Sequence, residues 1–205
     1  PGLGGANLHA SRSGIACLVA DDEDDACAIA ADLLSFLPDH NDAAPPFEET
    51  ADPSDRLTEE LESIVPDNPN KPYDMVKVIE TVVDDGRFVQ LFDAYAENII
   101  IGFARLGGRS VGVIANQPQV LAGCLDIDAS IKAARFIRTC DAFNLPLLTV
   151  EDVPGFLPGV VQEWGGIIRH GAKLLFAYAE ATVPILTLVT RQAFGGDSLA
   201  MSCQH

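Results

Sequence analysis

The chain has 205 residues, a formal net charge of −17 and 48% apolar residues, which is enough for a substantial core and for one or two domains. Residues 1–85 hold 20 acidic and 4 basic side chains, whereas residues 86–205 hold 10 acidic and 9 basic ones. This excess of negative charge argues against nucleic acid and anionic membrane surfaces as partners. No uncharged apolar run reaches 18 residues, so no membrane-spanning helix is expected.

The cysteines argue against a metal site and against a disulfide framework. All five are widely spaced, and no Cys-x-x-Cys pair occurs among Cys17, Cys27, Cys124, Cys140 and Cys203. Free thiols in a reducing compartment are therefore expected, with no metal bound. Residues 1–20 lack the basic start and apolar centre of a signal peptide, which favours the cytoplasm.

Two segments precede the main apolar part of the chain. In residues 1–37 we expect a short strand at 15–19 and a helix from about Asp24 to Leu37, where apolar residues recur at the helical period. Residues 38–72 hold seven prolines and almost no apolar periodicity. They predict an extended arm at a domain boundary, because long structureless segments are rare inside a compact domain.

From residue 73 to the end, apolar strands alternate with helices. We expect helices at 75–83, 128–143 and 161–182, and strands at 99–105, 110–115, 147–150 and 185–190. The helix at 128–143 is expected to bury Ile131, Ala134, Ile137 and Cys140. This alternation predicts an α/β layer fold. His205 falls only a few residues into a helix that opens at Gly196, so we expect the chain to be a fragment.

Glycine-containing turns follow the last two strands. Residues 152–159 read D-V-P-G-F-L-P-G, and Phe194-Gly195-Gly196-Asp197 forms the second turn. Two such turns can direct backbone N–H groups into one pocket, where they hold a developing oxyanion. This pattern indicates acyl transfer or enolate formation. The alternatives are a stiff strand–helix connection at the first turn and an ordinary helix at the second, with Asp197 as its N-cap.

Several side chains are weaker candidates. Glu163 is a possible general base, although a glutamate in the first turn of a helix more often interacts only with the helix dipole. Trp164 is a candidate for a pocket wall or a subunit contact, but core packing is the commoner role. His170 is expected to be structural or to lie at an interface. No nucleophile-elbow sequence supports a Ser/His/Asp triad.

Longer motifs are more specific than these parts. They are G-F-A-R-L-G-G-R-S-V-G-V-I-A-N-Q-P at 102–118, G-C-L-D at 123–126, C-D-A-F-N-L-P at 140–146, W-G-G-I-I-R-H-G-A-K at 164–173 and A-E-A-T-V-P at 179–184, with G-G-A-N-L-H-A-S-R-S-G-I-A at 4–16 and D-P-S-D-R-L at 52–57. Together with the loop at 152–159, they resemble the carboxyltransferase β subunit of biotin-dependent acyl-CoA carboxylases of the propionyl-CoA carboxylase type. The resemblance covers essentially the whole chain.

The resemblance implies a partial crotonase-like α/β fold, a spiral of ββα turns. Residues 1–37 would end an N-terminal crotonase-like domain, residues 38–72 would form the inter-domain arm, and residues 73–205 would begin a C-terminal crotonase-like domain. The family places acyl-CoA mainly on the first domain and carboxybiotin on the second, in a cleft between two subunits. It also implies a homo-hexameric core, a biotin carboxylase and biotin carrier partner, and a location in the cytoplasm or the mitochondrial matrix.

The implied reaction carboxylates the α-carbon of propionyl-CoA or acetyl-CoA. In this family carboxybiotin releases CO₂, the ureido nitrogen takes the α-proton, and the resulting enolate attacks CO₂. Backbone N–H groups of Phe156, Gly196 and Asp197 would hold the ureido oxygen. The residues implied to contact carboxybiotin are Gly155, Phe156, Leu157, Gly159, Gly195, Gly196, Asp197 and Leu199.

The chain departs from the family at the second turn. The family commonly reads Gly-Gly-Ala-Tyr where this chain has Gly195-Gly196-Asp197-Ser198. A non-catalytic paralogue that only assembles with carboxylase subunits therefore stays open, as does a biotin-dependent decarboxylase of the same fold. The 205-residue chain alone is expected to show no turnover.

Overall fold

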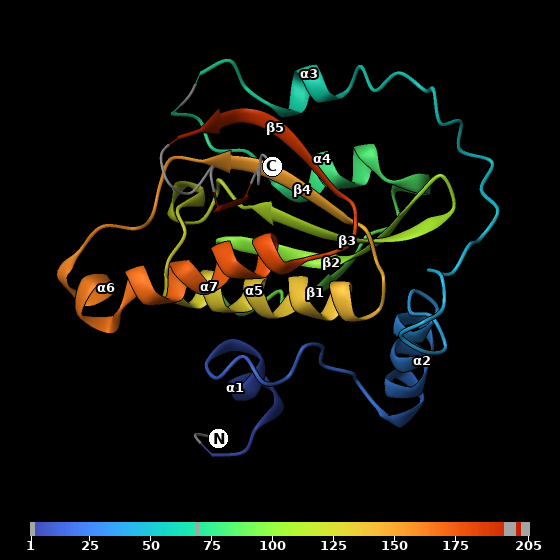
Figure 1. Ribbon diagram of the computed structural model, residues 1–205, viewed down its shortest axis with the longest axis horizontal. Helices are drawn as coiled ribbons and strands as arrows, with labels where there is room; N and C mark the ends of the chain where they lie inside the picture. The colour runs from blue at the N-terminus through green and yellow to red at the C-terminus, as the bar shows by residue number, and fades with distance from the viewer. Residues whose placement is uncertain (1–2, 69, 195–199, 202–205) are drawn as a thin grey trace.

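The structure, a computed structural model, describes residues 3–68, 70–194 and 200–201. Within these residues one mixed sheet contains the strands β1 (Val89–Leu91), β2 (Ile99–Leu106), β3 (Arg109–Asn116), β4 (Leu147–Val153) and β5 (Ile185–Ala193), in that spatial order. β1, β2 and β3 pair antiparallel, whereas β3, β4 and β5 pair parallel (Figure 1). The sheet therefore combines a hairpin with two parallel crossovers.

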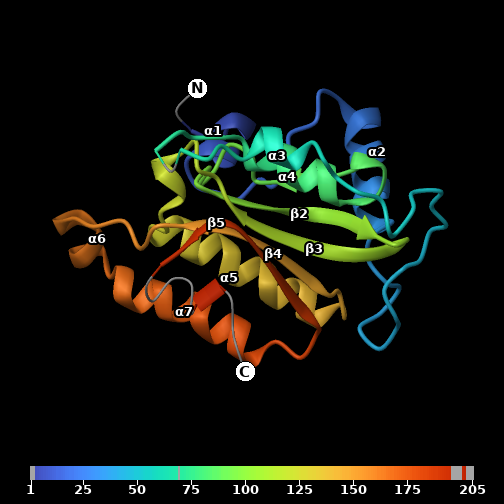
Figure 2. The same cartoon turned by 90° about the horizontal axis from the view of Figure 1, so that it is seen from above.

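Helices cover both faces of this sheet. α5 (Ile127–Ala142) and α7 (Ile167–Glu180) lie side by side on one face, and α4 (Met75–Val82) lies on the other (Figures 1 and 2). α5 connects β3 to β4, while α6 (Val160–Gly165) and α7 connect β4 to β5. Because parallel strands need such crossovers, the alternation in the sequence leads to the layered α/β architecture that it predicts.

Each face of the sheet has its own apolar core. Successive strand residues point to opposite faces, so a strand buried on both faces must be apolar throughout. Ile99 and Ile101 point toward α5, and Ile100 points toward α4. The buried residues expected on α5 are confirmed for Ala134, Ile137 and Cys140, but Ile131 is only partly buried, because it lines a cavity beside the N-terminal segment.

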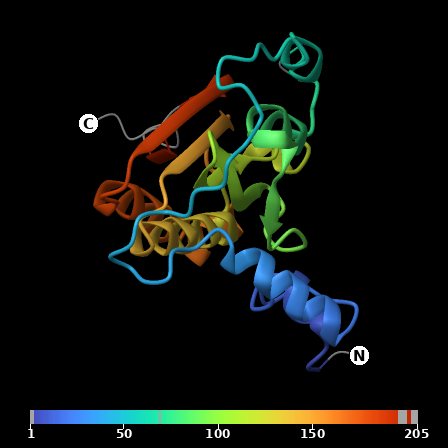
Figure 3. The same cartoon turned by 90° about the vertical axis from the view of Figure 1, so that its right-hand side faces the viewer.

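The first 37 residues differ from the sequence-based expectation. α1 (Ala6–Ser11) and α2 (Glu23–Leu34) lie outside the sheet and the helices that cover it (Figures 1 and 3), and α2 buries none of its residues. The expected helix to Leu37 is too long, because the chain turns after Leu34 and buries Phe36 against Phe103, with ring centroids 5.7 Å apart. The strand expected at 15–19 is wrong, since no neighbouring strand pairs with these described residues.

The proline-rich segment 38–72 is irregular where it is described, apart from the short helix α3 (Leu61–Ile64). It is attached to the β2–β3 hairpin, where Phe47 forms a bridge with Arg109 and the N–H of Glu48 donates to the carbonyl of Gly108 at 2.9 Å. This agrees with a surface arm. That the arm joins two domains stays a prediction.

The expected continuous helix at 161–182 is also wrong. Gly166 has a φ of 91°, and this left-handed residue ends α6 and separates it from α7. The sequence likewise did not predict β1 or the short 3-10 helices η1 (Asp84–Gly86) and η2 (Leu121–Gly123). Three residues are too few to show a periodic pattern.

The buried thiol of Cys140 gives a direct test of this core. Its side chain is fully buried and burial raises its pKa, whereas Cys27 is exposed. We expect iodoacetamide to modify Cys140 at least about 100-fold more slowly in the folded protein than in urea, since only the accessible thiolate reacts. Peptide mass spectrometry measures both rates, with Cys27 as the control that should react readily in both conditions. Rapid modification of Cys140 in the folded protein would contradict the α5 packing.

Candidate functional site

The candidate site lies at the edge of the sheet where the parallel strands end. In open α/β sheets, ligands bind beyond the carboxyl ends of the strands. β4 ends at Val153 and β5 ends at Ala193, and the N–H of Phe194 donates to the carbonyl of Val153 at 3.2 Å. The two glycine-containing turns therefore start beside each other, as the sequence indicated.

The loop after β4 is held by a short bridge to the segment before α5. Leu125 donates to the carbonyl of Gly155 at 3.2 Å, and Leu157 donates back to the carbonyl of Leu125 at 2.8 Å. Gly155 has a φ of 149°, in the region that favours glycine. Because N–H groups alternate in direction along an extended chain, the N–H of Phe156 points away from Leu125. Within residues 3–68, 70–194 and 200–201 it has no hydrogen-bond acceptor.

An apolar groove of about 320 Å³ lies between this loop and α7. The ring of Phe156 packs so closely over Gly171 that a Cβ there would lie 2.7 Å from the ring. The other residues that line the groove are Ile167, Ile168, Ala172, Leu175 and Ala200. All of these lining residues are apolar, as in most pockets that bind small ligands.

The remaining predicted carboxybiotin residues fall into two groups. Leu157 is half-buried in the bridge, while Gly159, with a φ of 139°, is the N-cap of α6. Four residues of the second turn lie outside the described residues: Gly195, Gly196, Asp197 and Leu199. Directly after them, Met201 is fully buried, and its sulfur accepts a hydrogen bond from Asn116 at 3.6 Å. The chain therefore returns to the carboxyl end of β3.

The weaker candidates Glu163, Trp164 and His170 do not line the groove. Glu163 is exposed on α6, and Trp164 is 87% exposed, so it is not a core residue. The ring Nδ1 of His170 lies 3.2 Å from the ammonium of Lys173. Among the described residues, no three histidine, cysteine or acidic side chains form a metal-binding group. None of the described helices has the length and apolar character needed to cross a bilayer.

A buried polar network at the end of β4 and β5 was missed by the sequence reasoning. The carboxylate of Asp152 is 2% exposed, accepts a hydrogen bond from the hydroxyl of Tyr73 at 2.8 Å and forms an ion pair with Arg191 at 3.1 Å. Burial, together with the charge of Asp152, raises the pKa of Tyr73 above its usual range, so the hydroxyl stays a donor. The available signal was an acidic residue inside an otherwise buried strand, since such a residue needs partners.

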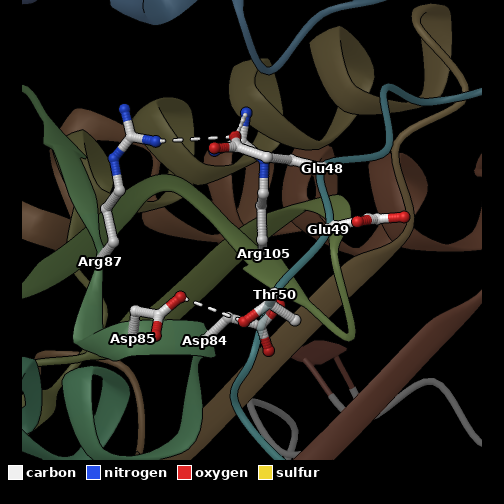
Figure 4. A pocket seen from close by; sticks show the side chains of 7 residues that line it. All are labelled: Glu48, Glu49, Thr50, Asp84, Asp85, Arg87 and Arg105. Atoms are coloured by element: carbon white, nitrogen blue, oxygen red, sulfur yellow. Dashed lines mark hydrogen bonds and ion pairs between the residues drawn. The ribbon is translucent and has the colours of Figure 1, made fainter.

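A second, small hollow of about 60 Å³ lies where the arm crosses the β2–β3 hairpin (Figure 4). Its polar groups contact each other: Arg105 forms an ion pair with Glu48 at 3.0 Å, and the hydroxyl of Thr50 donates to Asp85 at 3.1 Å. The residues that line it are Glu48, Glu49, Thr50, Asp84, Asp85, Arg87 and Arg105. We interpret this hollow as the place where the arm is attached to the rest of the chain, because Glu48 and Thr50 of the arm contact Arg105 and Asp85.

The comparison with protein families decides the affiliation. Residues 2–205 match the model of the carboxyl transferase domain. The chain belongs to this family.

Curated relatives extend the match along the whole chain. The propionyl-CoA carboxylase beta chain of Roseobacter denitrificans is 54% identical over 99% of this chain, and the mitochondrial enzyme of Homo sapiens is 53% identical over 99%. The methylmalonyl-CoA decarboxylase subunit alpha of Veillonella parvula is 57% identical over 98%. The chain spans 40%, 38% and 40% of these relatives, respectively.

Solved structures confirm the fold. The transcarboxylase 12S hexamer core with methylmalonyl-CoA bound matches 98% of this chain, with a TM-score of 0.94 and 53% identity, and the chain covers 38% of it. A single-chain long-chain acyl-CoA carboxylase matches with a TM-score of 0.85 and 29% identity over 98% of this chain and 20% of that one. The expected crotonase-like α/β fold is therefore confirmed.

Proposed function

We propose that the intact protein containing this chain transfers a carboxyl group between carboxybiotin and the α-carbon of a short-chain acyl-CoA. The observation that carries this proposal is the pair of turns that start beside each other after β4 and β5, next to an apolar groove. The names of the relatives above favour propionyl-CoA over acetyl-CoA as the acyl substrate.

The chain contributes backbone donors and an apolar wall. We assign the N–H groups of Phe156, Gly196 and Asp197 to an oxyanion hole for the ureido oxygen. Such donors stabilise charge without a reactive side chain. Residues assigned to the wall and shape of the carboxybiotin site are Gly155, Leu157, Gly159, Gly195 and Leu199. Carboxybiotin, when bound, supplies the carboxyl group and a nitrogen that accepts the α-proton.

The wider organisation follows the family. Residues 1–37 are proposed to end the N-terminal domain and residues 38–72 to form the arm, while residues 73–205 begin the C-terminal domain. A biotin carrier subunit with its biotin carboxylase would deliver carboxybiotin, and a homo-hexameric core is supported by the hexamer of transcarboxylase 12S. We place the protein in the cytoplasm, or in the mitochondrial matrix if its source is eukaryotic, as the human relative's name suggests.

A second candidate function is biotin-dependent decarboxylation. It is favoured by the 57% identity to a methylmalonyl-CoA decarboxylase subunit, which has a similar coverage of 98%. The same turns and groove would serve both reactions. The fate of the carboxyl group separates them: it is donated to an acyl-CoA in the first and finally released as CO₂ in the second.

Replacement of Asp197 tests the proposed oxyanion hole. A carboxylate at this position would repel the developing negative charge, so Asp197→Ala is expected to increase the rate of transfer about tenfold. The measurement is the rate of propionyl-CoA formation from methylmalonyl-CoA and biotin by the intact protein, with and without the substitution. Activity in Asp197→Ala alone would indicate a site disabled by the aspartate. Failure of both proteins would contradict the proposed reaction and favour an assembly role.

A further inference from the structure

The strand β5 carries a bulge where it passes the end of β4. A single residue of β4, Asp152, lies opposite the three residues 190–192 of β5. The flanking pairs are Glu151 with Val189 and Val153 with Ala193. Bulges often occur beside functional sites, because they change the direction of a strand and of the side chains that follow. Here the bulge lies immediately before Ala193, where β5 ends.

The side chain of Asp152 lies at this bulge and contacts two other side chains. Its carboxylate accepts a hydrogen bond from Tyr73 at 2.8 Å and forms an ion pair with Arg191 at 3.1 Å. The hydroxyl of Tyr73 also lies 2.7 Å from that of Thr190, and Thr190 donates to the backbone carbonyl of Glu151 at 3.2 Å. The guanidinium of Arg191 lies 5.0 Å from the ring centroid of Tyr73. The bulge residues Thr190 and Arg191 of β5 thus contact Glu151 and Asp152 of β4.

The same network reaches the arm and β3. Arg191 donates to the backbone carbonyls of Asn68 at 3.2 Å and Lys71 at 2.9 Å. The N–H of Asp152 donates to the side-chain oxygen of Asn116 at 3.2 Å. The end of the arm and the ends of three parallel strands are therefore connected through one buried aspartate.

We propose that Asp152, Tyr73 and Arg191 are positioning residues for the loop after β4, which carries Phe156, and for the end of β5. None of them belongs to the proposed oxyanion hole, and they act through the backbone that they fix. The catalytic consequence rests on the proposed function. Backbone donors must lie about 2.7–3.1 Å from the oxyanion, and a displacement of about 1 Å can cost about 100-fold in rate. A loosened bulge would therefore lower kcat without removing any group that contacts the substrate.

Amide hydrogen exchange in the intact protein tests the positioning directly. Tyr73→Phe removes one hydroxyl and preserves the ring, and we expect peptides covering 153–160 and 189–194 to exchange about tenfold faster than in the wild type. Tyr95→Phe is the matched control, because it removes a phenol hydroxyl that bonds to Asp128, away from β4 and β5. Equal exchange of these peptides in all three proteins would overturn the inference, whatever the activity of the wild type.

Kinetics then test the consequence for catalysis. For Tyr73→Phe and Asp152→Asn we expect kcat for carboxyl transfer to fall about 10- to 100-fold, while KM for acyl-CoA stays within about twofold. Tyr95→Phe should keep the wild-type kcat. Unchanged kcat in both network variants, or an equal loss in the control, would overturn the positioning role. An inactive wild type would instead overturn the proposed function, and the exchange result would still decide whether the network positions the loop after β4 and the end of β5.

Discussion

Replacement of Lys132 by methionine is expected to lower the free energy of unfolding by about 2 to 3 kcal/mol. This lysine projects from α5 and is 6% exposed. Its ammonium donates to the backbone carbonyls of Phe92, Tyr95 and Ile99 at 2.8, 2.6 and 2.8 Å, and the carbonyl of Ala96 lies at 3.3 Å. One buried ammonium group therefore donates hydrogen bonds along the whole segment between β1 and β2.

The expected loss is large because methionine fills similar space but has no donor. The carbonyls of Phe92 and Ala96 keep the N–H groups of Tyr95 and Ile99 as donors, but all four carbonyls lose a charged donor, and hydrogen bonds to charged groups contribute more than neutral ones. The segment also contains left-handed residues that need support, since Phe92 has a φ of 53° and Ala96 a φ of 45°. Without the ammonium, we expect residues 92–99 to detach from α5.

Urea-induced unfolding of the intact protein measures this effect. Lys173→Met is the matched control, because Lys173 is exposed on α7 and its replacement should change stability by less than about 0.5 kcal/mol. Similar unfolding midpoints for the two variants would contradict the role assigned to Lys132.

Replacement of Gly171 by valine is expected to reduce carboxyl transfer by the intact protein about 100-fold. A Cβ at this position of α7 would lie 2.7 Å from Cζ and 2.8 Å from Cε1 of the Phe156 ring. The ring would have to move, and the loop that presents the N–H of Phe156 would move with it. The helix itself should persist, since valine has a better helix propensity than glycine.

The comparison that isolates this effect is Ala179→Val, an exposed position on the same helix. Both variants introduce a β-branched residue into α7, but only one of them meets Phe156. We expect kcat/KM close to wild type in Ala179→Val, with the thermal midpoints of both variants showing that they fold. Full activity in Gly171→Val would mean that the position of Phe156 does not matter for transfer.

Much of the sheet could be predicted from local sequence. β2 and β3 are long apolar runs joined at Gly107 and Gly108, and both glycines adopt positive φ in the turn. The break at Gly166 could not be predicted in the same way, because it is one of several glycines in a helical pattern. The choice of which glycine becomes left-handed depends on tertiary packing.

The candidate site was only partly accessible to sequence reasoning. The turns were visible because glycine and proline follow apolar strands, and the resemblance supplied their roles. The Asp152 network was not visible, because Tyr73 and Asp152 are 79 residues apart and Tyr73 and Thr190 are 117 apart. One sequence contains no signal that pairs such distant residues.

The most direct test of the proposed function follows a labelled carboxyl group. The intact protein is incubated with methylmalonyl-CoA labelled in the free carboxyl and with a biotinylated carrier, and propionyl-CoA is then added after removal of the first substrate. Transfer predicts that the label appears on biotin and returns to the added propionyl-CoA. Label that never reaches biotin, or that is lost as CO₂ and does not return to acyl-CoA, would contradict the proposed carboxyl transfer.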